Sequence, residues 1–150
     1  MGLIPLRTDL HRFNERSECD CNSEKGCSNC SVILVLDSGD SNSTRTLFSN
    51  ELASEDDVIK PISDKIPIVD LAPGQRIRVE CHAMLGRGTE HAKWNSANIS
   101  TLVDAENEDE KILTVESTGA LNPEQIILAG IDEVANRLGE FRDMLNGIEE

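Results

Sequence analysis

The sequence predicts an α+β protein in which short strands make up most of the chain and one long helix ends it. Two patterns carry this prediction. Apolar and polar residues alternate strictly between positions 75 and 85, and apolar residues recur at helical spacing after position 122. A third observation is a cluster of four cysteines within twelve residues, which indicates a metal-binding knuckle in the β-rich part of the chain.

The clustered cysteines have the spacing Cys-x-Cys-x5-Cys-x2-Cys, and they are Cys19, Cys21, Cys27 and Cys30. Gly26 beside the second pair permits the tight turn that such a knuckle needs. Four thiolates around one ion, at about 2.3 Å per sulfur, are typical of structural zinc. The favoured cofactor is therefore one structural zinc ion. Because thiolates fill all four positions, no open position remains to activate water.

Three other states of the cluster remain as alternatives: no bound metal, two local disulfides, or an iron–sulfur cluster. Disulfides are typical of secreted proteins, but residues 1–6 lack the basic flank and long apolar stretch of a signal peptide. A cytoplasmic location is expected for this reason. An iron–sulfur cluster also takes four thiolates, yet the spacing differs from both ferredoxin patterns.

Composition excludes several classes of function. The chain has 150 residues with 28 acids against 14 bases, and its net charge of −14 argues against direct nucleic-acid binding, which requires clustered Lys and Arg. Three phenylalanines, one tryptophan and no tyrosine predict an aliphatic core without a stacking platform for single strands. No run approaches the length of about eighteen apolar residues that a membrane span needs.

Several strands are predicted in the first two thirds of the chain. Residues 32–36 are a short apolar run and are predicted to be a buried strand, with residues 44–48 as the returning strand of a hairpin. Pro67 indicates that residues 66–71 form an edge strand. The alternation over residues 75–85 predicts a half-buried strand, on which Cys81 points inward as a small apolar residue rather than a fifth metal ligand.

An acidic segment follows, with five acids in residues 104–110. It is predicted to be a solvated linker, because a calcium-binding loop would have regularly spaced ligands and a glycine. Strand character returns at residues 111–116.

The best-defined element is a helix that begins after Asn122. Asn122 is a suitable N-cap, Pro123 occupies the first helical position, and Gln125 completes a capping box. A helix of about 26 residues would reach roughly 39 Å, so its apolar side is predicted to pack on its own sheet and on a partner chain at once. That side is a heptad seam with alternating spacings of four and three: Ile127, Ile131, Val134, Leu138, Phe141, Leu145 and Ile148.

Four strings in this order carry a resemblance to a known family: residues 1–9 (MGLIPLRTD), the cysteine knuckle, residues 85–94 (LGRGTEHAKW) and residues 115–124 (VESTGALNPE). Together they resemble the D-type subunit of archaeal DNA-directed RNA polymerase, whose family includes the eukaryotic third-largest subunit and the amino-terminal domain of the bacterial alpha subunit. The resemblance covers nearly the whole chain. It implies a non-catalytic assembly-platform subunit that forms a heterodimer with a subunit-L-like protein and docks the large polymerase subunits.

The resemblance also implies a domain organisation. A β-rich insert domain of the alpha/D type would span residues 1–103 and carry the zinc knuckle. The acidic linker, residues 104–110, would lead to residues 111–150, the carboxy-terminal part of an α+β dimerisation domain ending in the long helix. The four clustered cysteines match the zinc ligands of family members, and the heptad seam matches the partner-binding helix.

One further group of residues is expected to contact a large subunit: Arg87, His91, Lys93 and Trp94. A catalytic patch is the alternative for this group, but no nucleophile with an orienting acid accompanies it at recognisable spacing. No catalytic residue is therefore assigned to the chain.

Two departures from the family pattern shape the expectations. Family chains have several dozen residues before the GLIPL string, so this chain is expected to lack the amino-terminal part of the subunit. Only about sixteen residues join Trp94 to Lys111, where many archaeal members hold a ferredoxin-like domain, so no iron–sulfur cluster is expected. The alternative function is a free-standing zinc-knuckle interaction module derived from that subunit.

Overall fold

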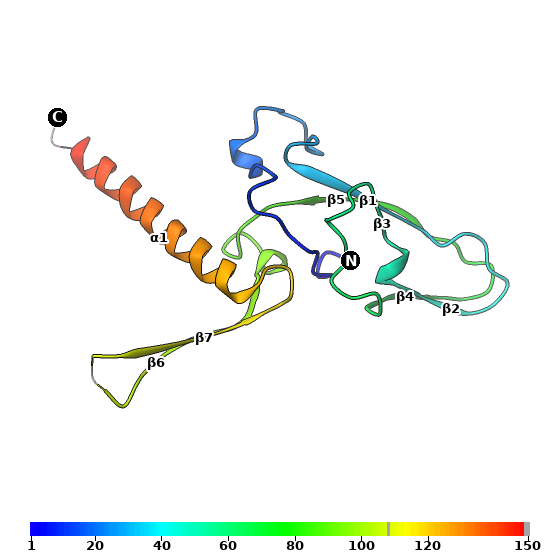
Figure 1. Ribbon diagram of the computed structural model, residues 1–150. Helices are drawn as coiled ribbons and strands as arrows, with labels where there is room; N and C mark the ends of the chain where they lie inside the picture. The colour runs from blue at the N-terminus through cyan, green and yellow to red at the C-terminus, as the bar shows by residue number, and fades with distance from the viewer. Residues whose placement is uncertain (108, 149–150) are drawn as a thin grey trace. The chain divides into compact units, whose positions relative to one another are not determined.

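The computed structural model describes residues 1–107 and 109–148, and it shows strands followed by one long helix (Figure 1). The chain forms two compact units, which divide between Asn95 and Ser96. The first unit contains β1 (Ser31–Asp37), β2 (Arg45–Phe48), β3 (Ala53–Ser54), β4 (Pro67–Leu71) and β5 (Arg78–Met84), and the second contains β6 (Ala97–Asp104), β7 (Lys111–Ser117) and α1 (Pro123–Asn146). The predicted α+β class is confirmed at this level.

The core of the first unit is aliphatic, as predicted, and lies between two antiparallel sheets. β1 is the central strand of a sheet with the order β3-β1-β5, while β2 pairs with β4. Alternate residues of β1 point toward β2 and β4, so one cluster of buried side chains draws on both sheets. Its members are Val32, Leu34, Leu36, Leu47, Leu52, Ile59 and Leu71.

The predicted hairpin between residues 32–36 and 44–48 is wrong, although both strands exist. β2 pairs with β4 instead of returning along β1. The reason is that both edges of β1 are occupied: β5 pairs with it along its whole length, and β3 pairs with it at Leu34 and Val35. The polar segment between β1 and β2 therefore carries the chain across to the second sheet.

Two other strand predictions are confirmed. β4 pairs with β2 alone among the described strands and begins at Pro67, as an edge strand would. The alternating segment forms β5, and Cys81 packs against the buried cluster from that strand. Cys81 is therefore a core residue of the first unit and not part of the cysteine cluster.

The second unit begins with a hairpin that the sequence did not indicate in full. β6 pairs with β7 along its length, and the acidic segment connects the two strands. Glu108 of this segment lies outside the described residues. β6 was missed because Ile99, Leu102 and Val103 do not alternate regularly with polar residues.

The helix begins where the sequence predicts and ends earlier than predicted. Asn122 Oδ1 accepts a hydrogen bond from the Gln125 amide at 2.9 Å, and Gln125 Oε1 accepts one from the Asn122 amide at 3.1 Å, which completes the capping box. The helix ends at Asn146, so Ile148 of the predicted seam lies beyond it.

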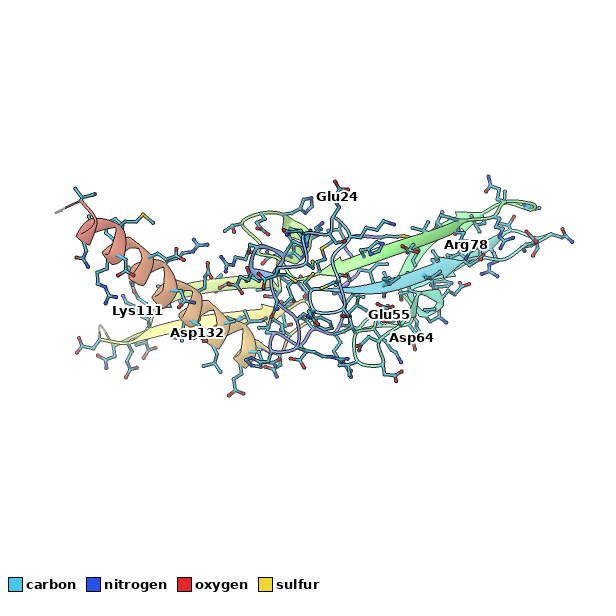
Figure 2. The ribbon with its side chains drawn as sticks, turned by 90° about the horizontal axis from the view of Figure 1, so that it is seen from above. Glu24, Glu55, Asp64, Arg78, Lys111 and Asp132 are labelled. Atoms are coloured by element: carbon cyan, nitrogen blue, oxygen red, sulfur yellow. The ribbon has the colours of Figure 1, made fainter. Side chains whose placement is uncertain are left out.

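Charged side chains are exposed on both units. Glu24, Asp64 and Arg78 illustrate this on the first unit, and Lys111 and Asp132 on the second (Figure 2). None of the helices in the described part of the chain has the length and apolar character needed to cross a membrane.

Candidate metal site

The four clustered cysteines lie in the loop that leads into β1. Cys30 immediately precedes the strand and is fully buried, while the other three are partly buried. The second cysteine pair forms a tight knuckle, because the amides of Cys30 and Ser31 both donate to the Cys27 carbonyl, at 2.9 and 2.8 Å. The Cys27 amide in turn donates to Cys30 Sγ at 3.3 Å. The start of β1 thus anchors half of the ligand set.

The four sulfur atoms lie within 4.8 Å of one another and can hold a single metal ion. The Sγ–Sγ distances are 3.7 Å for Cys19–Cys27, 3.7 Å for Cys21–Cys30 and 3.9 Å for Cys27–Cys30. A regular tetrahedron with metal–sulfur bonds of about 2.3 Å has edges of about 3.8 Å. The donor set therefore fits a tetrahedral ion such as zinc in both chemistry and spacing.

The thiols of this cluster ionise unequally. The Ser23 amide, hydrogen-bonded to the Cys21 sulfur, lowers the pKa of Cys21 to about 6, with the neighbouring thiols adding to the effect. At Cys19 a backbone hydrogen bond from Cys21 acts to lower the pKa, but burial and the neighbouring sulfurs outweigh it and raise the pKa to about 12. Adjacent thiolates oppose one another's ionisation, so four thiolates at this spacing require a cation among them.

A basic side chain outside the ligand set contacts this cluster. Arg16 Nη1 donates to Cys21 Sγ at 3.1 Å, and Nη2 donates to the Ser23 carbonyl. The Cys21 thiol is the largest cause of a raised pKa at Arg16. Sequence reasoning did not single out Arg16, because nothing in the local sequence pattern shows that its side chain turns toward Cys21.

The turn before Cys27 depends on glycine. Gly26 has a φ of +82°, and a Cβ there would lie 2.7 Å from both Cβ and Oγ of Ser31 and 3.2 Å from Cys30 Sγ. Both the backbone conformation and the space around it thus exclude a side chain.

We expect Gly26→Ala to weaken zinc binding roughly ten- to hundredfold, because overpacking of this kind costs about 1–3 kcal/mol and here displaces two ligand-bearing turns. Competition with a chromogenic chelator measures the change. Gly74→Ala is the matched control, since Gly74 has a φ of +78° but no atom within 4 Å of the position that a Cβ would occupy. Equal zinc affinity in the two variants would show that close packing around Gly26 is not the cause of weakened binding.

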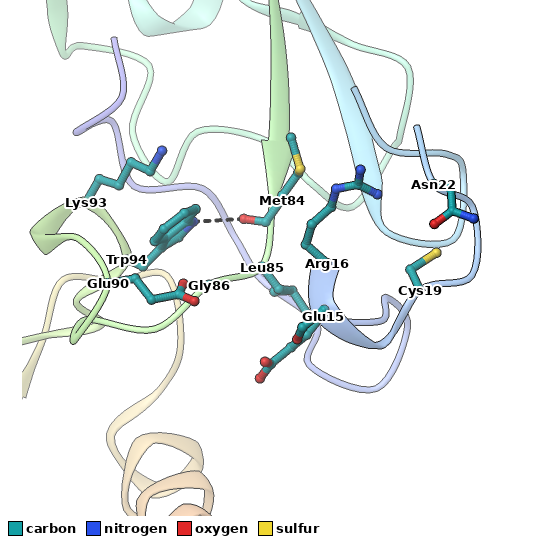
Figure 3. A pocket seen from close by; sticks show the side chains of 11 residues that line it. Glu15, Arg16, Cys19, Asn22, Met84, Leu85, Gly86, Glu90, Lys93 and Trp94 are labelled. Atoms are coloured by element: carbon teal, nitrogen blue, oxygen red, sulfur yellow. Dashed lines mark hydrogen bonds between the residues drawn. The ribbon is translucent and has the colours of Figure 1, made fainter. Parts of the chain in front are cut away.

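A cleft of about 650 Å³ adjoins the cysteine loop within the first unit. Arg16 and Cys19 line one side of it, and Lys93 and Trp94 line the other (Figure 3). Trp94 is held by a hydrogen bond from its indole nitrogen to the Met84 carbonyl at 3.0 Å. The cleft therefore connects the candidate metal site with the segment of residues 85–94.

The structure brings the four residues predicted to contact a large subunit onto one segment of the first unit. Arg87 pairs with Glu15 at 3.1 Å, and Lys93 Nζ lies 4.1 Å from the centre of the Trp94 ring. His91 Nδ1 accepts a hydrogen bond from the Lys93 amide at 3.0 Å, as the N-cap of a short 3-10 helix, Ala92–Trp94. The histidine ring thus has a local capping role, and the described contacts place no nucleophile against it.

The seam of α1 is mostly exposed. Ile127 is partly buried, whereas the other six predicted seam residues have between 48 and 79% of their surface exposed. Among the described residues of the second unit, none covers this side of the helix.

The same unit exposes apolar residues that the sequence analysis missed. They belong to the β6–β7 hairpin and are Ile99, Leu102, Val103, Ile112 and Leu113. Leu102 lies opposite Leu113 and Val103 opposite Ile112, so apolar pairs occupy both faces of a two-stranded ribbon. Such a ribbon is marginally stable alone, and exposed apolar patches of this kind mark interaction surfaces.

Comparison with known proteins gives consistent matches. The family model described as the RNA polymerase Rpb3/RpoA insert domain matches residues 1–118. DNA-directed RNA polymerase subunit Rpo3 of Methanosphaera stadtmanae is 43% identical over 98 residues, which is 64% of this chain and 36% of that protein. Rpo3 of Picrophilus torridus is 44% identical over 98 residues, covering 63% of this chain and 33% of the relative.

A third relative, Rpo3 of Archaeoglobus fulgidus, is 34% identical over 99 residues, or 66% of this chain and 36% of the relative. The chain thus spans about a third of the length of the curated relatives that it matches.

Proposed function

Because the chain belongs to the family of the RNA polymerase Rpb3/RpoA insert domain, we propose that it is a non-catalytic assembly subunit of a DNA-directed RNA polymerase, of the archaeal Rpo3 (D-type) kind. The observation that carries this proposal is the family match over residues 1–118, which spans the cysteine loop, the cleft and the β6–β7 hairpin. In this role the chain supplies surfaces on which other subunits assemble, and it contributes no group to nucleotidyl transfer.

The cofactor in this proposal is one structural zinc ion held by Cys19, Cys21, Cys27 and Cys30. Sulfur spacing close to a tetrahedral arrangement supports it. When bound, the ion would join the loop before β1 into a single rigid unit, because ligands from both cysteine pairs would be fixed to the same atom. Without an open coordination position, its contribution is structural.

The first partner in this proposal is a subunit-L-like protein that packs on the seam of α1. Support comes from the large apolar residues that are exposed on that helix and on the β6–β7 hairpin, because contiguous exposed apolar patches mark interaction surfaces. The insert domain, residues 1–103, and the dimerisation part, residues 111–150, remain the proposed functional division.

The second partner class is the large polymerase subunits, which we assign to the segment containing Arg87, His91, Lys93 and Trp94. Tryptophan and arginine are enriched at protein interfaces, and this segment presents an exposed arginine and a held tryptophan beside a cleft.

Replacing Lys93 with Glu is expected to weaken assembly with the large subunits at least about tenfold, while binding of the subunit-L-like partner stays unchanged. The change reverses the charge over the Trp94 ring and removes the cation–π contact. Reconstitution followed by size-exclusion chromatography measures it. Lys65→Glu, an equal charge reversal at another exposed position, is the control, and equal assembly of the two variants would contradict this docking surface.

A free-standing zinc-knuckle interaction module is the second candidate function. The observation in its favour is that Met1–Asn95 is a compact unit with its own buried cluster and the complete cysteine set. The two candidates differ in their partners: the polymerase subunit co-purifies with other polymerase subunits at equal stoichiometry, and the module does not.

A further inference from the structure

Contacts of the neighbouring residues hold Arg16 beside the cysteine cluster. It begins a short 3-10 helix, Arg16–Glu18, and the two preceding residues are tied to other parts of the first unit. The Asn14 amide donates to the Asn29 carbonyl at 2.8 Å, and Glu15 pairs with Arg87 at 3.1 Å. The two residues before Arg16 are therefore held by contacts with residues that are distant in sequence.

The guanidinium of Arg16 contacts two residues of the cysteine loop, and these two residues are separated by one position in the sequence. It donates to Cys21 Sγ at 3.1 Å and to the Ser23 carbonyl. Between these acceptors Asn22 adopts a left-handed conformation with a φ of 46°, which is an unfavourable conformation for most residues with a side chain. The planar fork of arginine can bridge two acceptors in this way, whereas the ammonium of lysine acts as a point charge.

The positive charge of Arg16 also matters, because a metal ion bound by four thiolates would leave the site negatively charged. An ion of charge +2 with four thiolates has a net charge of −2, and four acids lie nearby in sequence: Glu15, Glu18, Asp20 and Glu24. Lys25 is close in sequence too, but it is 74% exposed and lies 3.8 Å from Glu80. Arg16 is partly buried and in direct contact with a ligand sulfur, so it is well placed to offset the charge of the occupied site.

We propose that Arg16 is a positioning residue for the metal: its guanidinium bridges Cys21 Sγ and the Ser23 carbonyl, holds the Cys21 turn in its ligating conformation, and offsets the negative charge of the tetrathiolate site. This inference rests on the proposed zinc site. Groups that hydrogen-bond to metal ligands typically change metal affinity about 10- to 100-fold when removed.

The test measures zinc dissociation constants by competition with a chromogenic chelator, using the full chain and its Arg16→Gln, Arg16→Lys and Lys25→Gln variants. Arg16→Gln is expected to weaken zinc binding about 10- to 100-fold. Lys25→Gln removes the same charge from the same loop without a sulfur contact, and its affinity is expected to stay within about threefold of the original. Arg16→Lys is expected to recover only part of the loss, because it keeps the charge and loses the bridge.

Cobalt absorption spectra provide a second measurement that separates positioning from loss of the site. Arg16→Gln is expected to retain the spectrum of four-sulfur tetrahedral coordination at saturating cobalt. An affinity of Arg16→Gln within about threefold of the original chain, an equal loss in Lys25→Gln, or full recovery by Arg16→Lys would each overturn the proposal. If Arg16→Gln does not fold, Arg16→Lys is compared with the original chain, and a zinc affinity within about threefold of the original would overturn the bridging role of the guanidinium. Failure of the original chain to bind zinc would overturn the proposed metal site itself, which is a distinct result.

Discussion

Replacing Leu138 and Phe141 of α1 with Asp is expected to abolish binding of a subunit-L-like partner and to leave the zinc content unchanged. These side chains are 63 and 59% exposed in the chain by itself, so the free energy of unfolding of the isolated chain should change little. In the complex each carboxylate would be buried without a partner, at a cost of several kcal/mol. We expect the affinity to fall at least about a thousandfold, measured by titration calorimetry and co-purification.

A matched control adds the same charge elsewhere on the same helix. Asn136→Asp with Asn146→Asp introduces two carboxylates at exposed polar positions outside the seam, and partner binding is expected to survive. If the Leu138 and Phe141 variant binds as well as this control, the seam is not the partner contact.

Removal of the metal is expected to have the second large effect. We expect about one zinc ion per chain, and structural zinc sites in small domains contribute roughly 10–16 kcal/mol of apparent binding free energy at neutral pH. Chelation, or Cys30→Ser, should therefore disorder the loop that enters β1 and lower the melting temperature of the first unit. Acidification should release the ion as well, because the cysteines bind as thiolates. Metal analysis and thermal denaturation measure these outcomes.

Cys81→Ser is the control for the cysteine variants, since Cys81 packs against the buried cluster of the first unit and lies outside the ligand set. It is expected to leave the zinc content at that of the original chain. A content below about 0.2 zinc per chain, together with a melting curve that chelation leaves unchanged, would rule out a structural zinc.

Local features of this protein could be predicted from the sequence because short-range chemistry controls them. The capping box at Asn122 and Gln125 involves residues three positions apart, and the inward orientation of Cys81 follows from alternation within one strand. The cluster of four cysteines that can hold one metal ion was also identifiable, because twelve consecutive residues contain all four cysteines and the turn glycine. In each case the interacting groups are close along the chain.

Long-range pairing was decided only in the tertiary structure. β2 pairs with β4 because β5 and β3 occupy both edges of β1, a competition among strands up to about forty residues apart that no local pattern records. The contact of Arg16 with Cys21 likewise forms where the two preceding residues contact Asn29 and Arg87, which are distant in sequence. Sequence periodicity states which face of an element is apolar, and the fold determines which neighbour covers that face or leaves it exposed, as on α1.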